Sequence, residues 1–116
     1  MQTPIKRVAL ITGANRGIGF EIARQLAHKK MTVLMGARDN QTGAEARDRL
    51  SGTGLDAHFI LLDVTNPTSI QAALGRIQDE FRRLDVLVNN AGIMIDAETS
   101  ILQLGIGTAG APEPEH

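Results

Sequence analysis

The sequence has no cysteine, no tyrosine and no tryptophan, and its only aromatic side chains are three phenylalanines. Without cysteine the chain forms no disulfide and no thiolate metal site. Its three histidines are far apart and lack metal-ligand spacing, so we predict no metal site. Because aromatic residues are so few, the core must consist of isoleucine, leucine, valine and alanine. The lack of cysteine also fits a cytoplasmic protein.

Long apolar runs and an excess of one charge are absent as well. No run is long enough to span a bilayer, and no apolar stretch precedes the first expected strand, which argues against a signal peptide. The formal net charge of -1 gives no reason to expect nucleic acid or a membrane as a partner. With 116 residues, of which 42% are hydrophobic, the composition is that of one soluble globular domain.

Short apolar segments alternate along the chain with segments of helical periodicity. The apolar segments are continuous, which is typical of strands buried on both faces of a parallel sheet. We expect four strands, at Val8–Ile11, Thr32–Gly36, His58–Leu62 and Val86–Val88. Between them we expect three helices: Ile18–His28 with Ile18, Ile22 and Leu26 on its buried stripe, Gln41–Leu50, and a third that starts after an N-cap at Asn66 and contains Phe81.

This order of elements predicts an α/β fold, a partial doubly wound (Rossmann) parallel sheet of about four strands with helices on both faces. We assign residues 1–104 to this domain. After Leu104 the sequence is rich in glycine, alanine and proline and loses its apolar periodicity. We therefore predict a disordered tail over residues 105–116.

A glycine-rich segment joins the first expected strand to the first helix. In such a segment Gly13 allows a tight turn, Gly17 lets the backbone approach a pyrophosphate, and Gly19 permits close packing of helix on strand. The amides at the start of the helix then point at a phosphate. The alternative is that these glycines only end a strand. We predict cofactor contacts from Thr12, Gly13, Asn15, Arg16, Gly17, Ile18 and Gly19.

Two arginines stand where a dinucleotide-binding fold selects its cofactor. Folds that take NAD place an acid at the end of the second strand, whereas NADP needs a cation there. Here that strand is followed by Ala37 and Arg38, and Arg16 lies in the glycine-rich segment on the same side. Because guanidinium groups suit a phosphate, the pair predicts NADP(H). The alternatives are two solvated surface arginines, or a pairing of Asp39 with Arg38 that weakens the preference.

Two further segments complete a resemblance to a known family. Leu62-Asp63-Val64 ends the third expected strand, and Asn89-Asn90-Ala91-Gly92 follows the fourth. With the glycine-rich segment, which matches the pattern TGxxxGxG, they make the chain resemble the N-terminal part of a short-chain dehydrogenase/reductase. The resemblance runs from about Val8 to about Ile93. Within the family the sequence is most similar to carbonyl reductases that use NADPH.

The resemblance implies a role for each segment. It implies that the Asp63 carboxylate accepts a hydrogen bond from the adenine amino group, with a contribution from the Val64 backbone. It also places Asn90 beside the cofactor ribose, while Asn89 braces the sheet. Alternatively, Asp63 only begins the loop to the next helix, and the paired asparagines form a turn. The resemblance therefore adds to the predicted cofactor-binding residues Asp63, Val64, Asn90, Ala91 and Gly92.

The resemblance also implies hydride transfer between a nicotinamide cofactor and a carbonyl or alcohol. The family uses a tyrosine acid, a lysine that lowers the pKa of that tyrosine, and a serine, all on the fifth strand and the helix after it. This sequence has no tyrosine, and its only lysines are Lys6, Lys29 and Lys30. We therefore assign no catalytic residue and expect a truncated, inactive NADP(H)-binding portion of an oxidoreductase. The alternatives are a non-catalytic nucleotide-binding or interaction module and a non-functional truncated product.

The fourth expected strand has a further consequence for partners. In the doubly wound order it lies beside the first strand, and a fifth strand covers its other side. Because we expect no fifth strand, we predict that Val86–Val88 is a bare sheet edge through which the chain self-associates.

Overall fold

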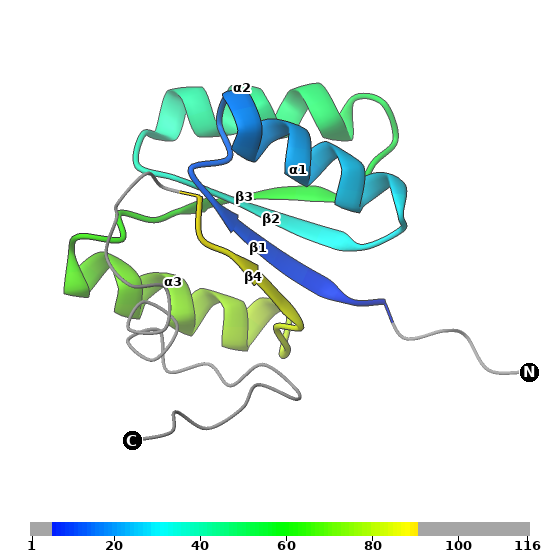
Figure 1. Cartoon of the computed structure of the whole chain (residues 1–116). Helices are drawn as coiled ribbons and strands as arrows, with labels where there is room; N and C mark the ends of the chain where they lie inside the picture. Colours follow the sequence, from blue (N-terminus) through cyan, green and yellow to red (C-terminus); the bar gives the residue numbers. More distant parts are fainter. Residues whose placement is uncertain (1–5, 91–116) are drawn as a thin grey trace, which may run out of the picture.

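The computed structural model describes residues 6–90, which form one parallel sheet with helices on both faces. The strand order is β3-β2-β1-β4, and α1 and α2 cover one face while α3 covers the other (Figure 1). The predicted α/β fold is confirmed for this part of the chain; the boundary at residue 104 and the tail 105–116 lie outside the described residues. The elements are β1 (Val8–Thr12), α1 (Gly17–His28), β2 (Thr32–Ala37), α2 (Asn40–Ser51), β3 (Ala57–Leu61), α3 (Pro67–Glu80) and β4 (Val86–Val88).

The two central strands, β1 and β2, are buried along their whole length. Successive side chains point to opposite faces, so Val8 and Leu10 pack toward α3 while Ala9 and Ile11 pack toward α1 and α2. This burial on both faces explains why the strand sequences are continuously apolar. The predicted strand bounds are correct to within one residue.

The two faces of the sheet carry different kinds of core. The α3-side core consists mainly of large aliphatic residues, with these buried members: Val8, Leu10, Leu34, Ile60, Leu62, Ile70, Ala73, Ile77 and Leu84. The α1/α2-side core is mostly alanine, with these buried members: Ala9, Ile11, Ala14, Ala23, Ala27, Val33, Met35, Ala46, Leu50 and Ala57. The small side chains let α1 and α2 approach the sheet closely.

The predicted buried stripe of α1 is wrong at its first member. Ile18 is 72% exposed, and the fully buried residues of α1 are Gly19, Ala23 and Ala27. Of the predicted stripe, Ile22 and Leu26 are partly buried and pack against the edge of the α1/α2-side core. The periodicity of bulky hydrophobic residues predicted that they form the buried face of α1. Because the helix lies close to the sheet, small residues form that face instead.

The ends of the helices follow recognisable capping rules. The predicted cap at Asn66 is confirmed, because its Oδ1 accepts from the N–H groups of Thr68 (2.9 Å) and Ser69 (3.3 Å). At the end of α1, Lys30 N donates to the Ala27 carbonyl (2.9 Å) and Met31 N to the Leu26 carbonyl (3.2 Å). This is a Schellman turn, and Lys30 adopts its left-handed conformation with φ 70° although glycine is usual there.

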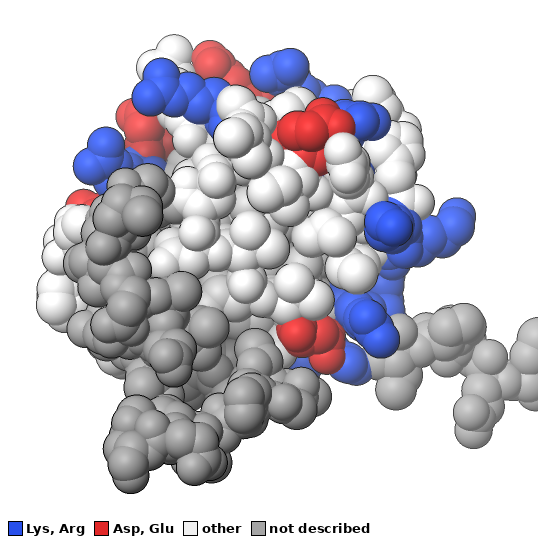
Figure 2. All heavy atoms as spheres, viewed as in Figure 1, with Lys and Arg blue, Asp and Glu red and all other residues white. Residues whose placement is uncertain are grey.

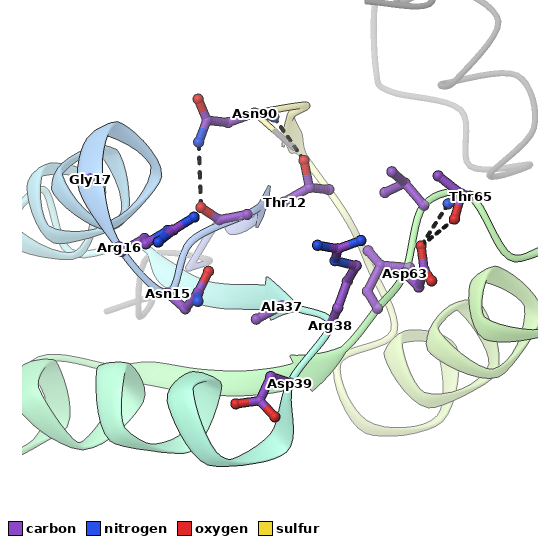
Figure 3. A pocket seen from close by; sticks show the side chains of 13 residues that line it. Thr12, Asn15, Arg16, Gly17, Ala37, Arg38, Asp39, Asp63, Thr65 and Asn90 are labelled. Carbon is purple, nitrogen blue, oxygen red and sulfur yellow. Dashed lines mark hydrogen bonds between the residues drawn. The ribbon is translucent and has the colours of Figure 1, made fainter. Parts of the chain in front are cut away.

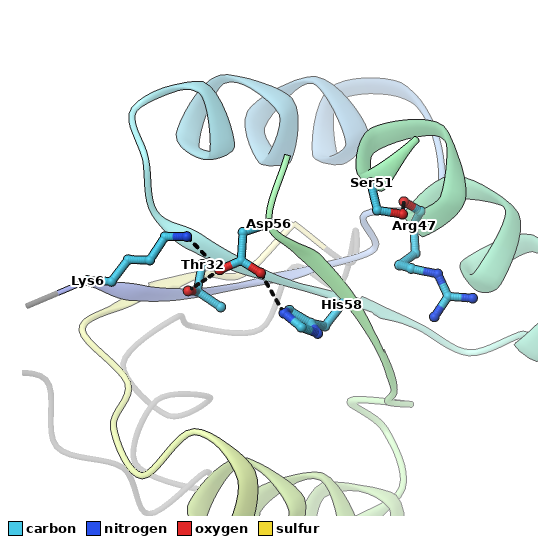
Figure 4. A network of polar contacts seen from close by, with 6 residues as sticks. All are labelled: Lys6, Thr32, Arg47, Ser51, Asp56 and His58. Carbon is cyan, nitrogen blue, oxygen red and sulfur yellow. Dashed lines mark hydrogen bonds and ion pairs between the residues drawn. The ribbon is translucent and has the colours of Figure 1, made fainter. Parts of the chain in front are cut away.

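A polar network ties the amino ends of β2 and β3 to the start of the chain (Figure 4). The Asp56 carboxylate accepts from Lys6 Nζ (2.8 Å) and Thr32 Oγ1 (2.6 Å), and it contacts His58 Nε2 at 2.7 Å. Partial burial raises the pKa of Asp56, but these hydrogen bonds outweigh it and lower the pKa to about 2. The network lies at the opposite end of the sheet from the cleft described below.

The two edges of the described sheet differ. On the β3 edge, Arg76 Nη1 donates to the Phe59 carbonyl (2.7 Å) while Arg76 Nε bonds Glu80 (2.9 Å), so one outward carbonyl is satisfied. On the other edge, β4 pairs with β1 and with no further strand among residues 6–90. The β4 residues are half-buried, and residues other than Lys, Arg, Asp and Glu dominate the centre of the face shown in Figure 2, with charged residues of both signs around the rim.

Candidate nucleotide-binding site

A cleft of about 590 Å³ lies at the carboxyl ends of the strands. In open parallel sheets this end of the strands is where ligands bind. The glycine-rich loop forms one wall and the segments after β2 and β3 form the other (Figure 3). The lining residues are Thr12, Gly13, Asn15, Arg16, Gly17, Ala37, Arg38, Asp39, Leu62, Asp63, Val64, Thr65 and Asn90.

Within residues 6–90, no side chain caps the backbone amides at the start of α1. Arg16 is the N-cap residue of α1 and its side chain makes no capping hydrogen bond, so the first amides of the helix lack that usual partner. Gly13 and Gly17 have φ of 63° and 62°, in the left-handed region that favours glycine. A Cβ on Gly17 would have no atom within 4 Å, so this backbone is open to a ligand.

The third glycine of the loop serves packing instead. A Cβ on Gly19 would lie 2.3 Å from the Gly13 carbonyl oxygen and 2.5 Å from Asn90 Nδ2. Only glycine therefore lets α1 begin this close to the end of β1 and to the residues after β4.

Hydrogen bonds centred on Thr12 join the ends of β1 and β4. The Thr12 side chain is buried; its hydroxyl accepts from Asn90 N–H (2.7 Å) and donates to Asn89 Oδ1 (3.0 Å). Asn90 Nδ2 also reaches the Gly13 carbonyl at 3.4 Å. Thr12 thus lines the cleft and is held there by Asn89, which is not itself a lining residue, while Asn90 both braces the loop and faces the cleft (Figure 3).

Charged side chains stand on both walls. Arg16 lies on the side of the glycine-rich loop, and Arg38 lies at the end of β2 beside Asp63 (Figure 3). The side chain and backbone N–H of Thr65 hold the pKa of Asp63 below its usual range, and the Arg38 charge adds a smaller lowering. Asp63 Oδ1 accepts from Thr65 N (2.9 Å) and Thr65 Oγ1 (2.6 Å), so this carboxylate is ionised and oriented.

Asp39, the residue considered as a partner for Arg38, is engaged elsewhere. It is the N-cap of α2, and its Oδ2 accepts from Thr42 N at 2.9 Å. Its carboxylate points away from Arg38 in Figure 3. Arg38 therefore keeps its guanidinium directed toward the cleft.

Most of the residues predicted from the sequence meet in the cleft, and two of them do not line it. Ile18 is exposed in the first turn of α1, and Gly19 is packed under the loop. Ala91 and Gly92 lie outside the described residues. Leu62 and Thr65 also line the cleft and were not predicted as binding residues, although the Asp-x-Thr spacing after β3 is a signal for the turn that places Thr65 there.

A family model described as short chain dehydrogenase matches residues 7–105. The chain belongs to the short-chain dehydrogenase family. The match covers all elements described above, including the glycine-rich loop and the segments after β2, β3 and β4.

Curated members of the family are similar over most of the chain. A (+)-neomenthol dehydrogenase of Capsicum annuum is 39% identical over 109 residues, which are 88% of this chain and 35% of that protein. Carbonyl reductase (NADPH) 1 of Mus musculus is 49% identical over 87 residues, 74% of this chain and 31% of that protein. The chain thus spans about a third of the length of these relatives.

Solved structures of the family share the fold. L-sorbose reductase from Gluconobacter frateurii, solved in complex with NADPH and L-sorbose, superposes with a TM-score of 0.76 at 26% identity. The superposition covers 86% of this chain and 45% of that one. In the described part of this family member, no helix is long and apolar enough to cross a membrane, and no cluster of three potential metal ligands occurs.

Proposed function

We propose that this chain binds NADP(H) in the cleft as the cofactor-binding portion of a short-chain dehydrogenase/reductase. The observation that carries the proposal is the charge at the end of β2, where the last strand residue is Ala37 and not an acid, and Arg38 supplies a cation. A ribose 2′-phosphate needs such a cation, whereas a free 2′-hydroxyl is served by an acid. Arg16, on the opposite wall, adds a second guanidinium.

The residues of the cleft fit the remaining parts of a dinucleotide. The open backbone at Gly17 and the uncapped start of α1 suit a pyrophosphate. The ionised Asp63, which lines the cleft and is held through Oδ1 by Thr65, is an acceptor suited to the adenine amino group. Asn90 would lie beside a ribose. When bound, the nicotinamide group supplies or accepts a hydride. The similarity to a carbonyl reductase and to a neomenthol dehydrogenase supports a carbonyl or an alcohol as the substrate class.

Cofactor titrations by calorimetry test this proposal. We expect the chain to bind NADPH more tightly than NADH. Each hydrogen bond to a charged group contributes about 1.5–3 kcal/mol, so Arg38→Ala should weaken NADPH binding by about tenfold or more and leave NADH binding nearly unchanged. Arg47→Ala is the matched control, because Arg47 is a half-exposed α2 residue paired with Asp48 outside the cleft. Equal affinities for the two cofactors in the unmodified chain would contradict the proposal.

For catalysis, we expect no turnover from the 116-residue polypeptide itself. Its sequence contains no tyrosine to act as the family's proton donor, and a positioned general acid typically contributes about 10²–10⁴-fold to rate. Purified chain supplied with NADPH and small ketones or aldehydes should show no carbonyl-dependent loss of NADPH absorbance. Sustained oxidation that depends on the carbonyl compound would overturn this part of the proposal.

A further inference from the structure

One side chain of α2 bonds directly to the glycine-rich loop. Asn15 Nδ2 donates to Thr42 Oγ1 at 3.2 Å, joining residues that are 27 positions apart. Asn15 lines the cleft, whereas Thr42 is in the first turn of α2 and does not. The position of the Asn15 amide in the cleft is therefore set from outside the cleft.

The backbone of Thr42 is itself held by the α2 cap. Asp39 Oδ2 accepts from Thr42 N at 2.9 Å. The backbone N–H of Thr42 and then its side chain are the interactions that lower the pKa of Asp39 below its usual range. The cap thus fixes the first turn of α2, and from that turn the Thr42 hydroxyl oxygen accepts from the Asn15 amide nitrogen.

This arrangement decides which end of the Asn15 amide a ligand meets. The nitrogen end is directed toward α2, and the oxygen end is directed away from it in Figure 3. Among residues 6–90 no side chain donates to Asn15 Oδ1. An amide oxygen is an acceptor, so it suits a ribose hydroxyl and not a phosphate.

We propose that Thr42 is a positioning residue for nucleotide binding, whose hydroxyl holds the Asn15 amide so that Oδ1 accepts from an adenosine ribose hydroxyl. The inference rests on the proposed NADP(H) site. NADPH and NADH both carry the 3′-hydroxyl of that ribose, whereas only NADPH carries the 2′-phosphate. Thr42 therefore contributes equally to both cofactors, in contrast to Arg38, which discriminates between them.

Two substitutions of the same residue separate the hydroxyl from the rest of the side chain. Thr42→Val keeps the shape and the backbone N–H that caps α2 but removes the hydroxyl, and Thr42→Ser keeps the hydroxyl. One lost hydrogen bond corresponds to about threefold to tenfold in affinity. We expect Thr42→Val to weaken NADPH and NADH binding by this factor with an unchanged ratio between them. Thr42→Ser should retain affinity within about twofold.

Introducing Thr42→Val into a chain that already carries Asn15→Ala tests whether Thr42 acts by positioning Asn15 or only stabilises the fold. If Thr42 acts through Asn15, Thr42→Val should have no further effect on affinity once Asn15 is alanine. An equal loss in both backgrounds, or full affinity of Thr42→Val, would overturn the inference. If the unmodified chain binds neither NADPH nor NADH, the proposed function itself is wrong. Thermal melting of each variant verifies that the binding measurements refer to folded protein.

Discussion

At Gly19 there is no space for a methyl group, so a side chain there would displace either the glycine-rich loop or the start of α1. We expect Gly19→Ala to lower the free energy of unfolding by about 1–3 kcal/mol, because the clash is with a backbone carbonyl and the second contact is the Asn90 amide. The same change should weaken NADPH binding. Because the chain has no tyrosine or tryptophan, far-UV circular dichroism during urea unfolding is the suitable measurement.

A matched control for this prediction exists in α3. A Cβ on Gly75 would meet no atom within 4 Å, and Gly75 is in the interior of α3. Gly75→Ala should therefore stabilise the chain by about 0.5–1 kcal/mol through helix propensity. Equal effects of the two substitutions would contradict the packing role given to Gly19.

The lowered pKa of Asp56 predicts that the free energy of unfolding decreases in acid. Its pKa in the folded chain is about 2, below its ordinary value of 3.8, so the folded state binds its proton less readily than the unfolded chain. The contribution is present above about pH 4 and is lost as the pH falls toward 2. After allowance for solvent screening of this partly exposed group, we expect about 1 kcal/mol.

Urea unfolding at several pH values tests the role of Asp56. Between pH 4 and 2 the unmodified chain should lose stability more steeply than Asp56→Asn. A change at exposed Asp79, Asp79→Asn, should leave the steep loss in place. Parallel curves for the unmodified chain and Asp56→Asn would show that the network with Lys6, Thr32 and His58 does not contribute.

At the scale of the elements, α1 ends in a turn that glycine would fit better. Lys30 has φ 70° and makes the backbone bonds of a Schellman turn. A left-handed non-glycine residue costs about 1 kcal/mol, so Lys30→Gly should raise the free energy of unfolding by about that amount. Lys29→Gly is the control, since Lys29 has φ -84° and should gain nothing. Thermal unfolding of both variants would reveal whether the gain is confined to position 30.

The elements also show what the sequence could and could not predict. Continuous apolar segments predicted all four strands, because strands buried on both faces need no polar alternation. The Asn66-Pro67 pair predicted the start of α3 because its capping chemistry is local. The Lys30 turn could not be predicted, because no glycine marks it. The prediction placed Ile18 wrongly on the buried face of α1. The alanines that actually contact the sheet are weakly hydrophobic and so stand out little in the sequence pattern.

The candidate site was predictable to a similar degree. Its glycine loop and the residues after β2, β3 and β4 come from short motifs that carry their own geometry, and most of them line one cleft. The Asn15–Thr42 bond joins two elements that only the fold brings together. The engagement of Asp39 with Thr42 rather than Arg38 also depends on where α2 starts.

At the scale of the whole molecule, the β4 edge predicts self-association. Asp85 N donates to the Val8 carbonyl, so strand alternation turns the Val86 N–H away from β1. Among residues 6–90 no strand pairs with this outward side of half-buried β4, and an edge of this kind is a template for pairing with another chain. We expect sedimentation velocity to show concentration-dependent association, and Val86→Pro, which removes an outward donor, to reduce it.

Val86→Ala is the control for that experiment, because it shortens the side chain and keeps the N–H. It should associate as the unmodified chain does. A compact monomer of the unmodified chain at high micromolar concentration would refute the prediction. The β3 edge should contribute less, since Arg76 already satisfies its outward Phe59 carbonyl.

The unlike cores on the two faces of the sheet make the molecule vulnerable to opposite kinds of substitution. On the α1/α2 side, where alanines such as Ala23 and Ala46 hold the helices close, an added methylene would push a helix outward and move the walls of the cleft with it. On the α3 side, removal of methylenes from Ile77 would leave a cavity beneath α3, a helix that contributes no residue to those walls. Sequence drift beneath α3 would therefore cost stability alone, while drift beneath α1 and α2 would change ligand affinity as well.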